Sequence, residues 1–307
     1  MTVADGNTEL EEAESKLCKA SKEELALKPL ASRGEKAAFL SAVIFTSGSL
    51  LIHGSRVSAS VSTQNEFLAK AVSDAAQSLT GKAAEVSRVG KTSEILISDA
   101  VELLGECRVL NSESWVVCDG IDKALTRERA DAAAFVRGAY LGGGSLIVPK
   151  YHLEFSFGKK TIAEDFAALI LRFGIKTELT AHRGRAVVYT KDSEHISDCL
   201  ALMGGVKAVL SLNSIIAARQ MSAHINRQQN CDMHNIDKQI NTGLSQCAYL
   251  KELDLSGVSQ GLKEAAQMRL AHPDYSYEQL AALLGITKSG LKNRLRRLKE
   301  IYERGGV

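Results

Sequence analysis

The 307-residue sequence predicts an α+β protein: a pseudo-twofold pair of α/β repeats followed by an all-α helix-turn-helix domain. Three observations predict this fold class. Residues 36–50 (KAAFLSAVIFTSGSL) recur in modified form as residues 132–146 (AAAFVRGAYLGGGSL). The same order of strand and turn patterns follows each copy. From about residue 212 onward the strand signals cease and helical periodicity continues to the C-terminus.

The composition is that of an ordinary globular protein, with 45% hydrophobic and 24% charged residues. No apolar run is long enough to cross a bilayer and no signal-peptide pattern is present, so we expect a cytoplasmic protein without membrane contacts. The six cysteines include no CxxC pair, which indicates reduced thiols. The net charge of +2 is unevenly distributed, because basic residues gather near the C-terminus.

Each repeat is predicted to run helix, hairpin, helix, hairpin, helix. Residues 85–105 resemble residues 179–204, since each segment has a strand, a glycine turn, a second strand, and a helix opened by an aspartate and ended by a glycine. Small residues in the opening helices, such as Ala42 and Gly138, would let these helices approach closely. The alternative is chance similarity between two helices rich in alanine and glycine. The remaining elements predicted within the repeats are strands at 57–61 and 151–157 and helices at 64–79 and 161–173.

These patterns predict four regions. They are the first repeat with an N-terminal helix at 1–111, the second repeat at 112–212, a helical linker at 213–255, and the helix-turn-helix domain at 256–307.

The helix-turn-helix prediction depends on helix-capping and helix-ending residues at fixed spacing. Pro273 ends one helix, and Ser276 can cap the next with Gln279 completing a capping box. Gly285 ends that helix, and Thr287 can cap the last one. The expected helices cover residues 277–284 and 288–302, and their core is predicted from Leu280, Ala281, Leu284, Leu291, Leu295 and Leu298.

The last helix carries a cationic surface that suits double-stranded DNA. The residues that we assign to DNA lie between Tyr275 and Tyr302, and fall into groups by expected contact. One exposed stripe is assigned to base or groove contacts and consists of Ser289, Lys292, Asn293 and Arg296. Phosphate contacts are assigned to Arg294, Arg297 and Lys299. The N-terminus of the helix carries Thr287 and Lys288. The alternative is a solvated basic face that merely suits the helix dipole.

The two opening helices resemble the motif of LAGLIDADG homing endonucleases, in which small residues line a helix–helix interface and Gly-Ser follows. Those enzymes hold divalent cations with an aspartate from each helix end, and these positions correspond here to Ser47 and Gly143. Residues 36–65 and 132–153 contain no Asp or Glu, although Mg²⁺ requires anionic ligands. The resemblance therefore implies a retained scaffold with no catalytic residues, no metal and no cofactor. The alternative is an active endonuclease that uses other carboxylates.

A LAGLIDADG-like pair followed by a helix-turn-helix resembles the WhiA family over nearly the whole chain. The similar segments are FVRGAYLGGGSL, YHLEF, VVYTKDSEHISDCLALMG, NRQQNCDMHN and AQMRLAHPDYSYEQLAALLGITKSGLKNRLRRL. The resemblance implies a DNA-binding, nucleoid-associated regulator of Gram-positive bacteria that acts in cell division, chromosome segregation and, in some lineages, sporulation. It also implies a helix-turn-helix similar to region four of sigma factors, although no other promoter-binding region supports a sigma-like subunit.

Several features leave alternatives open. The spacing of His224, Cys231, His234 and Cys247 fits no standard zinc site, so we predict no metal there. The polar segment 226–235 suits capping contacts between domains or contacts with the DNA backbone. The repeat platform could bind a protein co-regulator through its helical sides, or DNA through basic hairpin residues, namely Lys159, Lys160, Arg183, Arg185 and Lys191.

Overall fold

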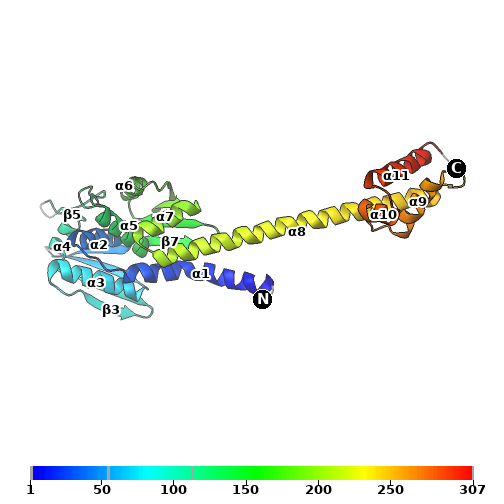
Figure 1. The fold of residues 1–307 in the computed structure, drawn as a ribbon. Helices are drawn as coiled ribbons and strands as arrows, with labels where there is room; N and C mark the ends of the chain where they lie inside the picture. The colour runs from blue at the N-terminus through cyan, green and yellow to red at the C-terminus, as the bar shows by residue number, and fades with distance from the viewer. Residues whose placement is uncertain (1–2, 54–55, 112–113, 306–307) are drawn as a thin grey trace. The chain divides into compact units, whose positions relative to one another are not determined.

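The computed structural model describes residues 3–53, 56–111 and 114–305 (Figure 1). The chain divides into two compact units, residues 1–218 and residues 219–307. None of the described helices is both long and apolar enough to cross a membrane.

The first unit contains the two predicted repeats, preceded by helix α1 (Val3–Leu27). The first copy consists of α2 (Arg33–Ser47), β1 (Gly48–His53), β2 (Arg56–Thr63), α3 (Glu66–Thr80), β3 (Glu85–Val89), β4 (Thr92–Ile97) and α4 (Val101–Glu106). The second copy consists of α5 (Arg129–Gly143), β7 (Gly144–Ile147), β8 (His152–Phe157), α6 (Lys160–Leu171), β9 (Glu178–His182), β10 (Arg185–Thr190) and α7 (Ser193–Met203). A small hairpin of β5 (Leu110–Asn111) and β6 (Val116–Val117) lies between the copies in sequence. The predicted order of elements is therefore confirmed in both copies.

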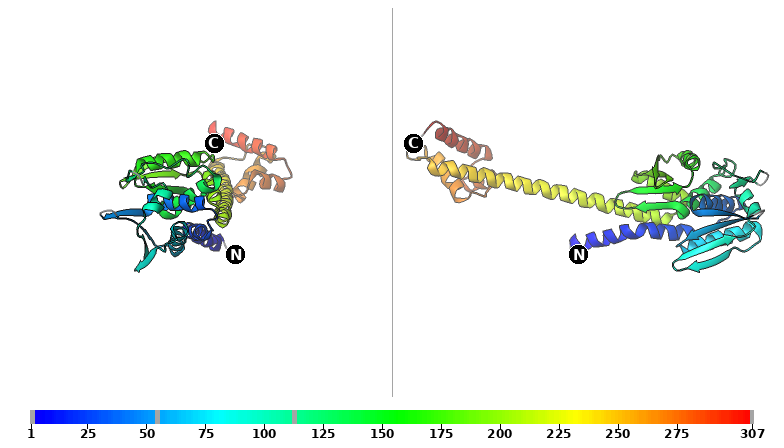
Figure 2. Two further views of the ribbon diagram at one scale, coloured as in Figure 1. Left: turned by 90° about the vertical axis from the view of Figure 1, so that its left-hand side faces the viewer. Right: turned by 180° about the vertical axis from the view of Figure 1, so that it is seen from behind.

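Each copy forms a four-stranded antiparallel sheet. The strand orders are β1-β2-β4-β3 and β7-β8-β10-β9, so the two copies have the same topology. Figure 2 shows the cyan strands of the first copy and the green strands of the second on either side of the blue α2. Along β8, Leu153, Phe155 and Phe157 are buried while the residues between them are partly exposed, as expected for a strand with one face on a core.

The central helices α2 and α5 pack against each other through small residues. A Cβ atom added to Gly138 would lie 2.4 Å from the carbonyl oxygen of Phe39, and one added to Gly142 would lie 2.2 Å from Oγ1 of Thr46. Since real Cβ atoms do not approach other heavy atoms this closely, these positions require glycine. The predicted close approach of the two opening helices is confirmed.

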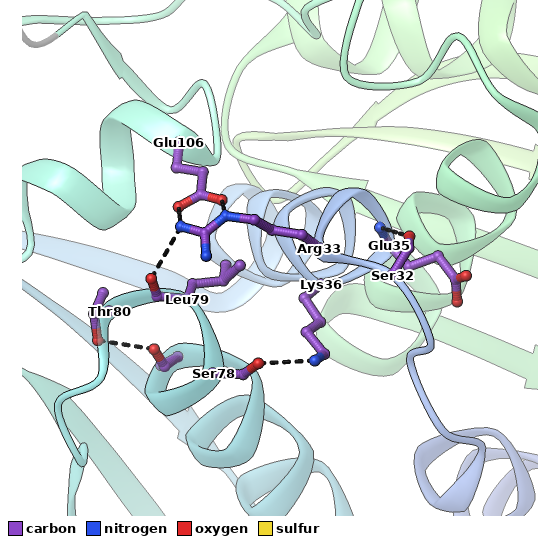
Figure 3. A network of polar contacts seen from close by, with 9 residues as sticks. Ser32, Arg33, Glu35, Lys36, Ser78, Leu79, Thr80 and Glu106 are labelled. Atoms are coloured by element: carbon purple, nitrogen blue, oxygen red, sulfur yellow. Dashed lines mark hydrogen bonds and ion pairs between the residues drawn. The ribbon is translucent and has the colours of Figure 1, made fainter.

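The N-terminal end of α2 is held by a polar network (Figure 3). Arg33 makes a bidentate contact with the Glu106 carboxylate at 2.5 and 2.6 Å and donates to the carbonyl oxygen of Leu79 at 3.0 Å. Lys36 donates to the Ser78 hydroxyl at 2.8 Å. The network joins α2 to the ends of α3 and α4, and so orients the central helix within the first copy.

The final helices of the two copies differ at their ends. In α7 the Asp192 side chain accepts from two backbone N–H groups, and Gly204 ends the helix in the left-handed conformation, as predicted. For α4 the prediction of an aspartate cap and a terminal glycine is wrong. Asp99 has a φ of 51° in the preceding turn, Ala100 occupies the N-cap without a side-chain bond, and Gly105 lies inside the helix. The turn geometry removes the Asp99 carboxylate from the capping position.

Helix α8 (Val206–Glu252) is one helix of 47 residues. It starts within the predicted second repeat, before the predicted linker. Its N-terminus is fixed by Glu24 of α1, whose two carboxylate oxygens accept from the backbone N–H groups of Lys207 and Ala208 at 2.8 and 2.9 Å. A carboxylate on these unpaired N–H groups stabilises a helix start, a long-range cap that local sequence does not reveal.

The second unit is helical. It contains α9 (Gln260–Ala271), α10 (Tyr277–Leu283) and α11 (Lys288–Glu303), packed against the end of α8. Its buried core consists of Tyr249, Leu250, Leu253, Ala265, Ala266, Leu280, Ala281, Leu291, Leu295 and Leu298. The last turns of α8, within the predicted linker, therefore belong to the core of the helix-turn-helix unit.

Candidate nucleic-acid interface

Helices α10 and α11 begin at the predicted caps. The Ser276 hydroxyl accepts from the N–H of Gln279 at 3.2 Å, and the Gln279 side chain accepts from the N–H of Ser276 at 2.8 Å, which completes the capping box. Gly285 follows α10 with a φ of +66°, and the Thr287 hydroxyl accepts from the N–H of Gly290 at 3.1 Å. This geometry confirms the predicted cap, turn and cap.

The apolar face of α11 packs on α10 as predicted. Leu291, Leu295 and Leu298 are buried on one side of the helix. Of the three α10 residues predicted to face them, Leu280 and Ala281 are buried, whereas Leu284 is only partly buried. The leucine face fixes the rotation of α11 and leaves its opposite face in solvent.

The opposite face carries the stripe that we assigned to base or groove contacts. Its four residues, Ser289, Lys292, Asn293 and Arg296, are all exposed. Lys292 lies with its Nζ 5.4 Å from the centre of the Tyr277 ring, a cation–π contact that restricts the lysine. Arg296 lies 3.9 Å from Glu300 on the same helix, a surface pair of little stabilising value.

The residues at the start of α11 are also solvent-accessible. Lys288 donates to the Glu278 carboxylate at 2.8 Å, and this hydrogen bond with the ammonium charge lowers the pKa of Glu278. The pair connects the first turns of α10 and α11. Thr287 and Ser289 are exposed beside it.

The three residues assigned to phosphates have different surroundings. Arg297 is exposed, and Lys299 is exposed with Glu303 at 3.4 Å. Arg294 is half-buried, donates to the carbonyl oxygen of Gly261 on α9 at 3.2 Å, and has Glu264 at 4.0 Å. Arg294 is therefore the least available of the three for a phosphate.

A buried arginine holds the turn between α9 and α10. Arg269 is only 2% exposed, and its guanidinium donates to the carbonyl oxygens of His272, Pro273 and Tyr275, the last at 2.7 Å. Gly243 of α8 lies against the same turn, because an added Cβ would be 1.8 Å from the carbonyl oxygen of Pro273. These contacts orient α10, and through it α11.

The second candidate site lies where the central helices end. Ser47 is the last residue of α2 and Gly143 the last residue of α5; these are the two positions that the resemblance predicts to correspond to the endonuclease aspartates. A Cβ added to Gly143 would lie 2.7 Å from the carbonyl oxygen of Ser156 and 2.8 Å from the Cβ of Thr46. There is no space for an aspartate at this position without a shift of backbone.

A guanidinium lies at these helix ends. Arg185 of β10 donates to the carbonyl oxygen of Thr46 at 2.6 Å, and to the carbonyl and hydroxyl oxygens of Ser156 at 3.0 and 2.7 Å. The Thr46 carbonyl is one of the four that a helix end leaves unpaired, and a cation there complements the negative end of the helix dipole. Arg185 thus supplies positive charge at the end of α2.

The described residues contain no cluster of three or more His, Cys, Asp or Glu side chains that could hold a metal ion. Cys231 and His234 are exposed on α8, and the Asn235 amide donates to the Cys231 sulfur at 3.7 Å. The polar segment 226–235 is exposed throughout, and the contacts predicted for it remain predictions.

Most basic residues of the platform hairpins have local partners. Lys159 pairs with Asp119 and Lys160 with Glu164. Lys191 lies over the Tyr189 ring, whereas Arg183 is exposed at the turn between β9 and β10. With Arg185 directed to the helix ends, the predicted basic surface on these hairpins is weaker than the sequence suggests.

Two family models match the chain. The WhiA LAGLIDADG-like domain matches residues 132–222, and the WhiA C-terminal HTH domain matches residues 225–302. A relative from Thermoanaerobacter pseudethanolicus, named "Probable cell division protein WhiA", is 34% identical over 305 residues, which cover 92% of this chain and 96% of the relative. The chain belongs to the WhiA family.

Other WhiA proteins agree with this assignment. A protein of the same name from Clostridium perfringens is 30% identical over 295 residues, which cover 89% of this chain and 92% of that protein. The crystal structure of "full-length DUF199/WhiA from Thermatoga maritima" has the same fold, with a TM-score of 0.56 and 23% identity over 94% of this chain and 98% of that one. The predicted WhiA resemblance and fold class are confirmed.

Sequence reasoning missed the arginines that organise both parts of this WhiA protein. Arg33, Arg185 and Arg269 each donate to backbone carbonyl oxygens at the end of a helix or in the turn that follows one. Their partners are distant in sequence or belong to an irregular turn, so no spacing rule identifies them. Only Arg185 drew attention from the sequence, and then as a DNA contact.

Proposed function

We propose that this protein is a non-enzymatic, sequence-specific DNA-binding regulator of transcription that reads double-stranded DNA with α11. The observation that carries the proposal is the exposed stripe opposite the leucine face, with Lys292, Asn293 and Arg296 at helical spacing. Side chains of this kind on a capped second helix reach base edges in the major groove. Arg297 and Lys299 flank the stripe and would hold phosphates, with Arg294 contributing less because of its bond to Gly261.

The family and its relatives support a role in cell division, and we extend the proposal to chromosome segregation and sporulation in lineages that sporulate. Within the chain we propose a first repeat at 1–111, a second at 112–212, a linker at 213–255 and a DNA-binding domain at 256–307. The protein would act in the cytoplasm at the nucleoid.

Mobility-shift titration with operator fragments, found by genome-wide footprinting, tests the DNA-binding proposal. Lys292→Ala and Arg296→Ala should each weaken specific binding by about 1–3 kcal/mol, while Lys251→Ala, which removes an exposed lysine of α8, should bind as the parent does. Unchanged affinity in both α11 variants would refute the assignment of the recognition helix.

A second measurement separates phosphate contacts from base contacts. Arg297→Ala should weaken binding to all sequences alike and reduce the slope of log affinity against log salt by about 1. Arg294→Ala should reduce the slope less, since its guanidinium already donates to Gly261.

The non-enzymatic part of the proposal rests on the helix ends of the platform. Ser47 and Gly143 offer no carboxylate, and Arg185 adds positive charge that opposes a divalent cation. Supercoiled plasmid incubated with Mg²⁺ or Mn²⁺ should remain intact. Cleavage at catalytic protein concentrations would establish the endonuclease alternative instead.

The first sheet of the platform also supports a role other than cleavage. Its register places one set of alternating residues on the face away from the core: Ser49, Leu51, Arg56, Ser58, Ser60, Ser62, Glu85, Ser87, Val89, Thr92, Glu94 and Leu96. This set contains two carboxylates and a single cation, Arg56, so it carries no excess of positive charge. Such a face suits a protein co-regulator better than a phosphate backbone.

A further inference from the structure

Tyr277, the first residue of α10, contacts a cation of the candidate recognition helix. The Lys292 ammonium lies 5.4 Å from the centre of the Tyr277 ring, and Lys292 belongs to the exposed stripe of α11. Tyr277 is itself half-buried and lies outside α11. The ring therefore connects α10 to α11 at the surface that the proposed function assigns to DNA.

Residues of two other helices hold the Tyr277 ring in place. Its hydroxyl oxygen accepts from the Gln246 amide of α8 at 2.7 Å. The Arg269 guanidinium of α9 lies 5.4 Å from the ring centre, and Arg269 is only 2% exposed. Because these partners belong to separate packed helices, the ring is restricted to its place beside Lys292 in the protein without DNA.

The surroundings of Lys292 differ from those of other cations on α11. Four of those cations have a carboxylate within 4.0 Å that competes with DNA for them: Lys288, Arg294, Arg296 and Lys299. The face of an aromatic ring attracts an ammonium group through the ring quadrupole. This contact uses none of the three N–H donors of the ammonium, so Lys292 can stay on the ring and donate to a base at the same time.

We propose that Tyr277 is a positioning residue for sequence reading, whose ring holds the Lys292 ammonium where it donates to a base edge in the major groove. The inference rests on the proposed function, because it requires that α11 read DNA. A free lysine loses rotamer freedom when it is fixed on a base, and the ring removes part of that cost before DNA binds. A donor at a fixed place discriminates among bases, whereas a mobile cation attracts any phosphate. Tyr277 should therefore matter for the operator and not for DNA in general.

Mobility-shift titration of the full chain against an operator and a scrambled duplex of equal length tests this role. Tyr277→Leu removes the ring and should weaken operator binding about two- to fivefold, the range of one exposed cation–π contact, with unchanged affinity for the scrambled duplex. Tyr277→Phe keeps the ring and should restore operator binding to within about twofold of the parent. The matched control is Tyr302→Leu, which changes a tyrosine whose hydroxyl donates to Glu252, and it should leave both affinities unchanged.

The contact between ring and lysine can be measured in the parent chain by nuclear magnetic resonance. Nuclei above an aromatic ring resonate upfield, so the ε-methylene protons of Lys292, assigned by their loss in Lys292→Arg, should lie upfield of those of the other lysines. The displacement should persist in the operator complex and disappear in Tyr277→Leu. A Lys292 signal without this displacement would overturn the proposal even if Tyr277→Leu destabilises α10.

A double-mutant cycle separates positioning from any other role of Tyr277. If the ring acts through the lysine, Tyr277→Leu should have no further effect on operator binding once Lys292→Ala is present. A further loss of about twofold or more in that background, or parental operator affinity of Tyr277→Leu alone, would overturn the positioning role and leave α11 as the reading helix. Unchanged operator binding of Lys292→Ala would overturn the assignment of Lys292 to base contacts, and this inference with it.

Discussion

Removal of the Arg185 side chain should destabilise the first unit. The guanidinium donates to the carbonyl oxygen of Thr46 at 2.6 Å and to two oxygens of Ser156 at 3.0 and 2.7 Å. Hydrogen bonds from a charged donor contribute about 1.5–3 kcal/mol each, but these three share one half-buried group that water can partly replace. We therefore expect Arg185→Ala to lower the free energy of unfolding by about 2–3 kcal/mol, close to the value of one such bond and well below three.

Urea denaturation followed by fluorescence of Trp115 measures this change, because the only tryptophan of the chain lies in the first unit. Arg185→Lys provides the control, because it keeps the charge at the end of α2 but cannot reach all three oxygens. Its free energy of unfolding should therefore fall by about half as much as that of Arg185→Ala. An unfolding free energy for Arg185→Ala within about 0.5 kcal/mol of the parent would refute the view that Arg185 joins β10 to the central helices.

The remaining predictions concern helix packing and helix ends. Gly138→Ala should lower the free energy of unfolding by about 1–3 kcal/mol in the same urea assay, because its Cβ would lie 2.4 Å from a carbonyl oxygen. Gly158→Ala, whose added Cβ would have no neighbouring atom within 4 Å, should have a free energy of unfolding within about 0.5 kcal/mol of the parent. Thr287→Ala should lower the stability of the helix-turn-helix unit by about 1 kcal/mol in thermal unfolding, through loss of the cap on α11. A fragment of residues 243–307 should melt cooperatively by circular dichroism, while a fragment of residues 256–307 should not, because it lacks the α8 residues of the core.

The sequence predicts the fold well where local rules decide the structure. Glycines and caps such as Ser276, Gly285 and Thr287 mark helix boundaries that the structure confirms. The repeated segments predict two copies with one topology, since the same local patterns produce the same strand order. The α4 boundary was wrong because Asp99 adopts a positive φ in its turn, a conformation that composition alone does not indicate for aspartate.

The sequence could not predict which side chains of the site contact backbone groups far away in the chain. The periodicity of α11 identifies which residues are exposed, and the structure agrees for Lys292 and Arg296. Periodicity does not reveal that Arg294 reaches α9 or that Arg185 reaches the end of α2, because each partner is a backbone carbonyl far away in sequence. Periodicity also does not indicate that the last turns of the predicted linker lie in the core of the second unit, where Tyr249 is buried.

The central helices separate a packing requirement from a chemical one. In the endonuclease motif the small residues and the metal-binding aspartates are adjacent, but they serve separate physical requirements. The close approach at Gly138 is needed to pack α2 on α5 whether or not DNA is cleaved. The helix ends meet a packing requirement of their own: Gly143 lies too close to Ser156 to carry a larger side chain, and Arg185 satisfies the carbonyl oxygen of Thr46. A metal site at these helix ends would therefore require a carboxylate at Gly143, a moved strand and removal of a guanidinium together, and no single one of these changes would bind a divalent cation.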